Sequence, residues 1–340
     1  MECIKHYIYL KYKNMGGTMK KKILKVTGAA AAGFGIFLEL GWSFFNITVH
    51  QKRSRKDNTR KQWFQFPEMK KNHPRNNYPE EYDAGKAWCM QQTMQDCYMK
   101  SQDGLLLHAS YLPAKDPKRT ILLSHGYRGT SFNDFAYISK FLHENNCNLL
   151  FIDQRCCGKS EGEYITFGAL EKQDVKLWTD YIAKRNKRRL PIYLYGESMG
   201  AATVLMASGL KLNDDVKGII SDCGFSSMKS QLKDIAHKWF HIKWPELLIF
   251  RIDILCRVVA KFRMDDADVT KALRRNKRPI LFFHGDEDTF VYPDNASYNY
   301  AICKAPKELI VVNGARHISS VYVEPDLYKQ KLLEFFEKYD

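Results

Sequence analysis

From about residue 96 onward, short continuous apolar runs alternate with segments of helical hydrophobic periodicity. The apolar runs are Thr120–His125, Asn148–Asp153, Ile192–Gly196, Val216–Asp222, Pro279–Gly285 and Glu308–Gly314. The helical patterns are Asp134–Asn145, Leu170–Arg185, Ala201–Leu212, Asn295–Lys304 and Leu327–Tyr339. Buried apolar strands that alternate with helices predict a mostly parallel sheet covered on both faces. The preceding segment, Asp96–Ala114, alternates around Asp103-Gly104 and predicts a β-hairpin.

A second apolar feature lies near the N-terminus. Val26–Val49 is 24 residues long with one charged residue, Glu39, which is long enough to cross a bilayer as a helix. We therefore expect an uncleaved, single-pass transmembrane anchor, with a soluble amphipathic helix as the alternative. Both flanks are basic, so the positive-inside rule leaves open the side of the membrane on which the remaining chain lies.

These patterns divide the 340-residue chain into four parts. We expect a basic lead over residues 1–22, the anchor over 23–49, a polar linker over 50–85 and one domain of alternating strands and helices over 86–340. Residues of about 228–270 interrupt the strand–helix alternation and predict a helical cap. The lead is polar and tyrosine-rich, whereas Met19 opens an ordinary basic segment, so we expect the native start at Met19.

Charge and cysteine content narrow the class of protein. Residues 1–61 hold thirteen Lys or Arg and three acids, which is +10 of the total net charge of +15. A basic arm beside an apolar segment favours a membrane flank over nucleic acid, and the remainder lacks a basic stripe with interleaved aromatic residues. The nine cysteines include no C-x-x-C pair, so we expect most of them to be small buried hydrophobic residues.

The chemistry-bearing residues follow the predicted strands. Ligands gather at the carboxyl ends of strands in such sheets. Gly196-Glu197-Ser198-Met199-Gly200 follows one strand and precedes a helix, which is the context that a nucleophile elbow requires. Asp288 and His317 follow two later strands, so serine, acid and histidine are predicted at one edge of the sheet.

This trio supplies the parts of nucleophilic catalysis. The Ser198 hydroxyl is a poor nucleophile until a base takes its proton, and the His317 imidazole serves as that base near neutral pH. The Asp288 carboxylate would orient the imidazole and stabilise its charged form. No metal or cofactor is needed, because these three groups complete the chemistry. A structural glycine-rich turn is the alternative interpretation.

Residues of about 96–336 resemble the serine-aminopeptidase-like group of the α/β-hydrolase superfamily. The matching motifs are His125-Gly126-Tyr127, Asp153-x-Arg155-x-x-Gly158-x-Ser160, Gly196-x-Ser198-x-Gly200, His284-Gly285-x-x-Asp288 and Gly314-x-x-His317. The resemblance implies an α/β-hydrolase fold with a cap, and an oxyanion hole formed by the backbone N–H groups of Tyr127 and Met199. Cys156 and Arg316 stand where the group usually has glycine, and both departures lie near the site.

Some neighbouring residues compete for these roles. His125 and His284 also end strands, but each precedes a glycine, which favours a loop-shaping hydrogen bond. Asp286 and Asp222 compete with Asp288 as the triad acid, and the resembled motif favours Asp288, with Asp222 as the fallback.

The sequence therefore predicts a membrane-anchored serine hydrolase that cleaves a carboxylic ester, thioester or amide through an acyl-enzyme. Its expected substrate is a small-molecule, lipid or peptide acyl compound, and nucleic acid is not an expected partner. One alternative is a peptidase that releases N-terminal residues. Another, from a different class, is a hydrolase-fold binding protein without activity.

Overall fold

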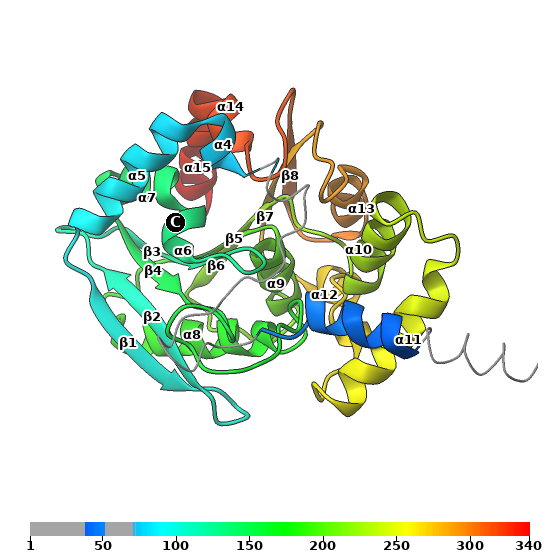
Figure 1. Cartoon of the computed structure of the whole chain (residues 1–340). Helices are drawn as coiled ribbons and strands as arrows, with labels where there is room; N and C mark the ends of the chain where they lie inside the picture. The colour runs from blue at the N-terminus through cyan, green and yellow to red at the C-terminus, as the bar shows by residue number, and fades with distance from the viewer. Residues whose placement is uncertain (1–37, 52–70, 72) are drawn as a thin grey trace, which may run out of the picture.

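The computed structural model describes residues 38–51, 71 and 73–340 (Figure 1). Its centre is a sheet of β1 (Gln95–Lys100), β2 (Leu106–Leu112), β3 (Arg119–Ser124), β4 (Cys147–Ile152), β5 (Ile192–Glu197), β6 (Val216–Asp222), β7 (Ile280–Gly285) and β8 (Lys307–Val312). The strand order is β1-β2-β4-β3-β5-β6-β7-β8. β1 pairs antiparallel with β2, and β2 pairs antiparallel with β4, while all other neighbours are parallel. The predicted mostly parallel sheet and its leading hairpin are confirmed.

Helices cover both faces of this sheet (Figure 1). The longer ones outside the cap are α5 (Pro79–Gln91), α7 (Ala136–Glu144), α8 (Glu171–Arg185), α9 (Met199–Ala207), α13 (Asp294–Ile302) and α15 (Pro325–Tyr339). Short helices are α4 (Pro74–Asn77), α6 (Ser131–Asp134), α12 (Thr270–Arg275) and α14 (Ser320–Val323). One core cluster joins the sheet to α8, α9 and the cap, and the other joins it to α5, α7 and α15. Strands β3–β7 are buried along their length except at Lys217 on β6, which explains the continuous apolar runs, because each strand faces a helix layer on both sides.

The cap between β6 and β7 is helical. It contains α10 (Met228–Asp234), a π-helical turn (Ile235–Trp239), α11 (Pro245–Val258) and a short 3₁₀ turn (Met264–Asp266). The inner sides of α10 and α11 bury Leu232, Leu248 and Ile252 in the core cluster that also contains α9. The cap is therefore packed onto the sheet domain as part of one core.

Part of the predicted linker, residues 50–85, is structured. α4 and the first half of α5 lie within that range, and α5 packs against α7. Gly85 allows this packing, because a Cβ at that position would overlap the backbone of Ala136. Tyr82 is buried in the core cluster on this face of the sheet. Pro74 and Pro79 begin α4 and α5. A stretch of short helices that start at prolines has the same composition as a linker, and this is why the sequence predicted a linker here.

The predicted anchor, residues 23–49, needs a larger correction. Residues 23–37 lie outside the described residues, as does Met19, but residues 38–48 form a helix that packs on the sheet domain. Phe45 and Val49 are fully buried in its core. We call residues 38–51 the strap. No helix in the described ranges combines the length and hydropathy needed to cross a membrane. Part of the apolar character of this second half is explained by burial of Phe45 and Val49 in the protein core.

Candidate active site

Ser198 occupies a sharp turn between β5 and α9. Its backbone has φ 53° and ψ −117°, a strained combination for a residue other than glycine. The flanking glycines permit this turn, because a Cβ on Gly196 would overlap the backbone of Gly200, and one on Gly200 would overlap the carbonyl of Ser124. The Ser198 N–H donates to the Asp222 carbonyl at 2.9 Å, which ties the turn to β6.

The structure brings the three predicted catalytic residues together. The Ser198 Oγ lies 2.8 Å from the Nε2 of His317, and the Nδ1 of His317 lies 2.7 Å from the Oδ2 of Asp288. All three side chains are buried, and they come from the loops after β5, β7 and β8. This chain of contacts has the arrangement in which an acid orients a base toward a hydroxyl nucleophile.

Asp288 is held in its ionised form. Burial alone would raise its pKa, but His317, His284 and their hydrogen bonds bring the pKa of this carboxyl well below its usual range. Its second oxygen accepts the backbone N–H groups of Phe290 and Val291 at 2.8 and 2.9 Å. The fixed carboxylate therefore faces His317 with one oxygen while the other is tied to its own loop.

The competing residues have other partners. Asp222 accepts the hydroxyl of Tyr328 at 2.9 Å, and Asp286 accepts the N–H of Gly314 at 2.7 Å. His125 lies 2.8 Å from the Gly126 carbonyl through Nδ1 and accepts the Gln154 N–H at 3.1 Å through Nε2. These contacts shape the loops around the site.

His284 contacts both its own loop and Asp288, the predicted acid. Its Nε2 lies 2.8 Å from the Val291 carbonyl and 3.3 Å from the Oδ2 of Asp288. It thus supports the position of Asp288 in addition to shaping a loop.

The two residues predicted to supply the oxyanion hole flank Ser198. Met199 is the first residue of α9, and both Tyr127 and Met199 line the small pocket above Ser198. The loop that carries Tyr127 is fixed by Asp134, whose Oδ2 accepts the Gly126 N–H at 2.7 Å. Backbone N–H groups at such positions are suited to stabilise a developing oxyanion.

The strap completes the site, and the sequence did not predict this. The Tyr127 hydroxyl donates to the Thr48 carbonyl at 2.9 Å, and Arg128 Nη2 donates to the carbonyls of Ile47 and His50 at 2.9 and 3.1 Å. Thr48 lines the pocket beside Ser198. The tyrosine after His125-Gly126 is the one sequence feature that bears on this contact, but its partner is 79 residues earlier in the chain.

The pocket above Ser198 is apolar and narrow. Beyond Tyr127, Ser198 and Met199, the lining comes from the strap, the cap and the loops after β4, β6 and β7, namely Thr48, Phe167, Phe225, Gln231, Leu232, Ile235 and Phe290. Its free volume is about 20 Å³, about what one water molecule needs. A substrate therefore has to displace part of this lining, and the strap and the cap supply much of it.

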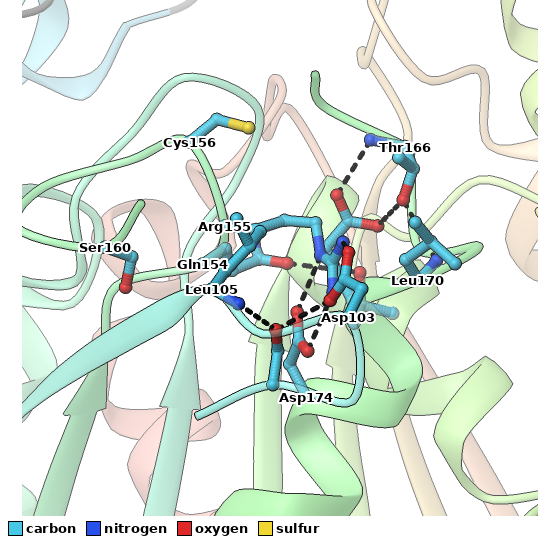
Figure 2. A network of polar contacts seen from close by, with 12 residues as sticks. Asp103, Leu105, Gln154, Arg155, Cys156, Ser160, Thr166, Leu170 and Asp174 are labelled. Atoms are coloured by element: carbon cyan, nitrogen blue, oxygen red, sulfur yellow. Dashed lines mark hydrogen bonds and ion pairs between the residues drawn. The ribbon is translucent and has the colours of Figure 1, made fainter. Parts of the chain in front are cut away.

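A polar network positions the loop that carries Phe167 (Figure 2). Arg155 donates to both carboxylate oxygens of Asp174 on α8, at 2.8 and 2.9 Å, and to Asp103 in the hairpin turn at 3.0 Å. Glu171 accepts the N–H groups of Thr166 and Gly168, each at 2.8 Å. The bidentate Arg155–Asp174 pair is buried, and the same Arg155 contacts Asp103, so this side chain joins the hairpin to α8 and supports this side of the pocket.

A second buried feature is the residue that precedes Ser198 in the chain. Glu197 is buried, and burial, together with the nearby Asp134 and Asp222, raises its pKa well above the ordinary value. Burial therefore favours the protonated form of this carboxyl group. The sequence did not predict that Glu197 is buried, because the elbow motif does not restrict the residue at this position.

One group of side chains in the described ranges has metal-ligand composition. Cys223, Asp288 and His317 place one ligand-type atom each within 4.8 Å of one another. Burial raises the pKa of the Cys223 thiol well above its usual value, and Asp288 and His317 are already bonded to each other. A metal needs a thiolate, so these residues do not fit a metal site.

Comparisons with known proteins agree with this geometry. Residues 115–277 match the model of the family described as serine aminopeptidase, S33. The uncharacterised protein YqkD of Bacillus subtilis is 26% identical over 223 residues, 65% of this chain and 72% of the relative.

Two solved esterases share the fold. The Pyrococcus furiosus esterase Pf2001 has a TM-score of 0.60 at 22% identity, over 74% of this chain and 93% of that one. Est1E of Butyrivibrio proteoclasticus, solved with ferulic acid, has a TM-score of 0.55 at 21% identity, over 72% and 98%. At these identities the structural likeness establishes the fold, and the family match adds the class of enzyme. The chain therefore has the α/β-hydrolase fold, and residues 115–277, just under half of it, are similar to the serine aminopeptidase family.

Proposed function

We propose that this hydrolase cleaves a carboxylic ester or thioester with an apolar acyl group, through an acyl-enzyme on Ser198. The observation that carries the proposal is the chain of contacts from Ser198 through His317 to Asp288 beneath an apolar pocket. His317 takes the Ser198 proton as the hydroxyl attacks the carbonyl carbon, and returns it to the leaving group. The N–H groups of Tyr127 and Met199 receive the oxyanion. Water then attacks the acyl-enzyme with His317 as base.

The pocket lining supports an apolar acyl group. Phe167, Phe225, Leu232 and Phe290 offer ring and aliphatic surface above Ser198, and burial of apolar groups there gains about 25 cal/mol per Å². The family match and the esterases of the same fold favour acyl transfer to water in general. Part of the lining has to move to admit such a group, because the free volume of about 20 Å³ holds about one water molecule.

A serine aminopeptidase-type activity is the second candidate, because the matched family carries that description. Such an enzyme has to bind the α-ammonium group of its substrate, for which a buried or nearby carboxylate is the usual partner. Among the described residues that line the pocket, none is acidic. This composition favours the ester or thioester over an aminoacyl amide.

The test combines labelling with a substrate panel on the full chain. We expect a fluorophosphonate probe to label the wild type and not Ser198→Ala. Hydrolysis of p-nitrophenyl esters should fall by about 10³-fold or more in Ser198→Ala and in His317→Ala. Ser208→Ala, a buried serine just beyond α9, is the matched control and should keep both properties. Retained labelling in Ser198→Ala would reject the proposal, and faster cleavage of aminoacyl anilides than of esters would favour the peptidase.

A further inference from the structure

Helix α11 of the cap is apolar on its outer side as well as its inner side. Leu247, Phe250 and Val258 on this helix are 58%, 64% and 62% exposed, and Trp244 at its start is 65% exposed. Steps of three and four residues from Leu247 through Phe250 and Ile254 to Val258 place these side chains along one side of the helix. A helix that covers a core needs only one apolar side, so the outer stripe requires a separate reason.

The strap extends this apolar surface. It lies next to α11, and in Figure 1 its blue helix runs beside the yellow cap helix. Gly41 approaches Arg251 of α11 so closely that a Cβ would overlap that side chain, and the ring centroids of Phe44 and Phe240 lie 5.1 Å apart. Of thirteen exposed large hydrophobic residues in the described part of the chain, seven lie here: Leu40, Trp42, Phe240, Trp244, Leu247, Phe250 and Val258. We call these seven residues the outer cap face.

The surroundings of the outer cap face carry a modest net positive charge. Residues 228–270 contain eight Lys or Arg and six acids. Several of these charges are paired, namely Glu246 with Lys233, Asp253 with Arg257, Asp234 with Lys238 and Asp265 with Lys229. The Lys243 Nζ lies 5.1 Å from the centroid of the Trp244 ring, which places a cation at the border of the apolar surface. Tryptophan with lysine at the edge of an apolar surface is the composition found at the boundary between lipid headgroups and acyl chains.

The chain that precedes the strap points to the same partner. The described part begins at residue 38 on this surface. Residues 26–37 contain no charged residue, and Lys20, Lys21, Lys22 and Lys25 come before them. Along the chain, a basic segment therefore comes first, an apolar segment follows it, and the strap with its part of the outer cap face comes next. Each basic residue near an anionic bilayer contributes about 1 kcal/mol, so this order suits a negatively charged lipid surface.

We propose that the outer cap face docks on an anionic lipid bilayer, with the side chains of Trp244, Leu247 and Phe250 inserted among the lipids. The docked strap would then lie between the bilayer and Ser198, since it carries the exposed Trp42 and also Thr48, which lines the pocket. The proposal concerns binding alone and does not depend on the chemistry at Ser198.

The test measures binding of the full chain to vesicles of phosphatidylglycerol and phosphatidylcholine in equal parts, by flotation. We expect Leu247→Glu/Phe250→Glu to lower the apparent partition coefficient by about tenfold or more, because two apolar anchors become anions that the surface repels. Met90→Glu is the matched control, since Met90 is an exposed apolar residue on α5, away from the cap, and should bind like the wild type. Ser198→Ala should also bind like the wild type.

Three results would overturn the proposal. The first is unchanged binding of the double variant, which would leave residues before the strap as the lipid contact. The second is an equal loss of binding in Met90→Glu. The third is a dimer in solution that the double variant converts to a monomer, which would make the outer cap face a contact between two copies. Hydrolysis of a soluble ester by the double variant, measured without vesicles, checks that the fold is intact.

Discussion

The two sides of the pocket differ in how they are built. The lower side consists of loops after β5, β7 and β8 and carries Ser198, Asp288 and His317. The upper side consists of the strap and the cap, and it contributes Thr48, Leu232 and Ile235. On the lower side, short motifs fix the geometry through glycines and hydrogen bonds between neighbouring loops. On the upper side, apolar residues of the strap and of the cap, which are far apart in the chain, pack in the same core cluster.

This difference explains why an apolar segment that was predicted to cross a membrane can instead pack on the protein core. The strap is apolar because Phe45 and Val49 are buried against the hydrolase core. Hydropathy alone reports that a segment avoids water and does not report what covers it. Glu39 is one polar signal in the segment, and it is exposed to solvent in the structure. A segment can therefore satisfy the length criterion for a membrane span while half of it packs on a folded domain.

The largest expected effect tests the lower side of the pocket. In Gly200→Ala, the new Cβ would overlap the Ser124 carbonyl, and the turn that holds Ser198 has to shift. A displacement of about 1 Å at a reacting group costs about 10²-fold in rate, so we expect kcat/KM for an activated ester to fall at least that far. The measurement is kcat/KM per folded protein, with folding checked by circular dichroism.

The control for this variant is Gly104→Ala in the hairpin turn. Gly104 has φ 89° and no atom within 4 Å of a new Cβ, so the substitution strains the backbone without touching the site. It should lower the melting temperature and leave kcat/KM unchanged. Wild-type activity in Gly200→Ala would mean that the elbow does not depend on its glycine.

The sequence predicted the lower side well because its signals are local. Gly196 and Gly200 bracket Ser198 within five residues, and each later strand end supplies one partner, Asp288 or His317. The strand and helix order followed from apolar periodicity, since β3–β7 are buried on both faces. The positions of α4, α5 and the strap were missed. The contacts that hold α5 and the strap join residues distant in sequence, such as Gly85 with Ala136 and Thr48 with Tyr127.

A second prediction concerns the buried carboxyl beside the nucleophile. Burial raises the pKa of Glu197 above that of the unfolded chain, so its contribution to stability is full below the ordinary carboxyl pKa and is lost as pH rises toward the folded-state value. Glu197→Gln keeps the shape and cannot ionise. Relative to this variant, the wild type should lose about 1.4 kcal/mol of unfolding free energy per pH unit above about pH 4.3.

Urea unfolding at several pH values between about 5 and 8 measures this difference. Glu337→Gln on the exposed side of α15 is the control for loss of a surface carboxylate. A constant difference for Glu197→Gln would show that Glu197 ionises in the folded protein. The lower side of the pocket would then hold a charge behind Ser198.

The smallest expected effect concerns the attachment of the strap. Tyr127→Phe removes the hydroxyl that donates to the Thr48 carbonyl at 2.9 Å, and keeps the backbone N–H and the ring. One hydrogen bond contributes about 1 kcal/mol, so opening of the strap should become about fivefold more frequent. The Ile165 amide reports this opening through hydrogen exchange, because it donates to the Val49 carbonyl at 2.8 Å.

Tyr98→Phe, at an exposed tyrosine on β1, is the control and should leave that exchange unchanged. Unchanged exchange in Tyr127→Phe would mean that Arg128 and the buried Phe45 and Val49 hold the strap without the hydroxyl. The upper side of the pocket would then be held mainly by burial of apolar side chains, in contrast to the hydrogen-bonded lower side.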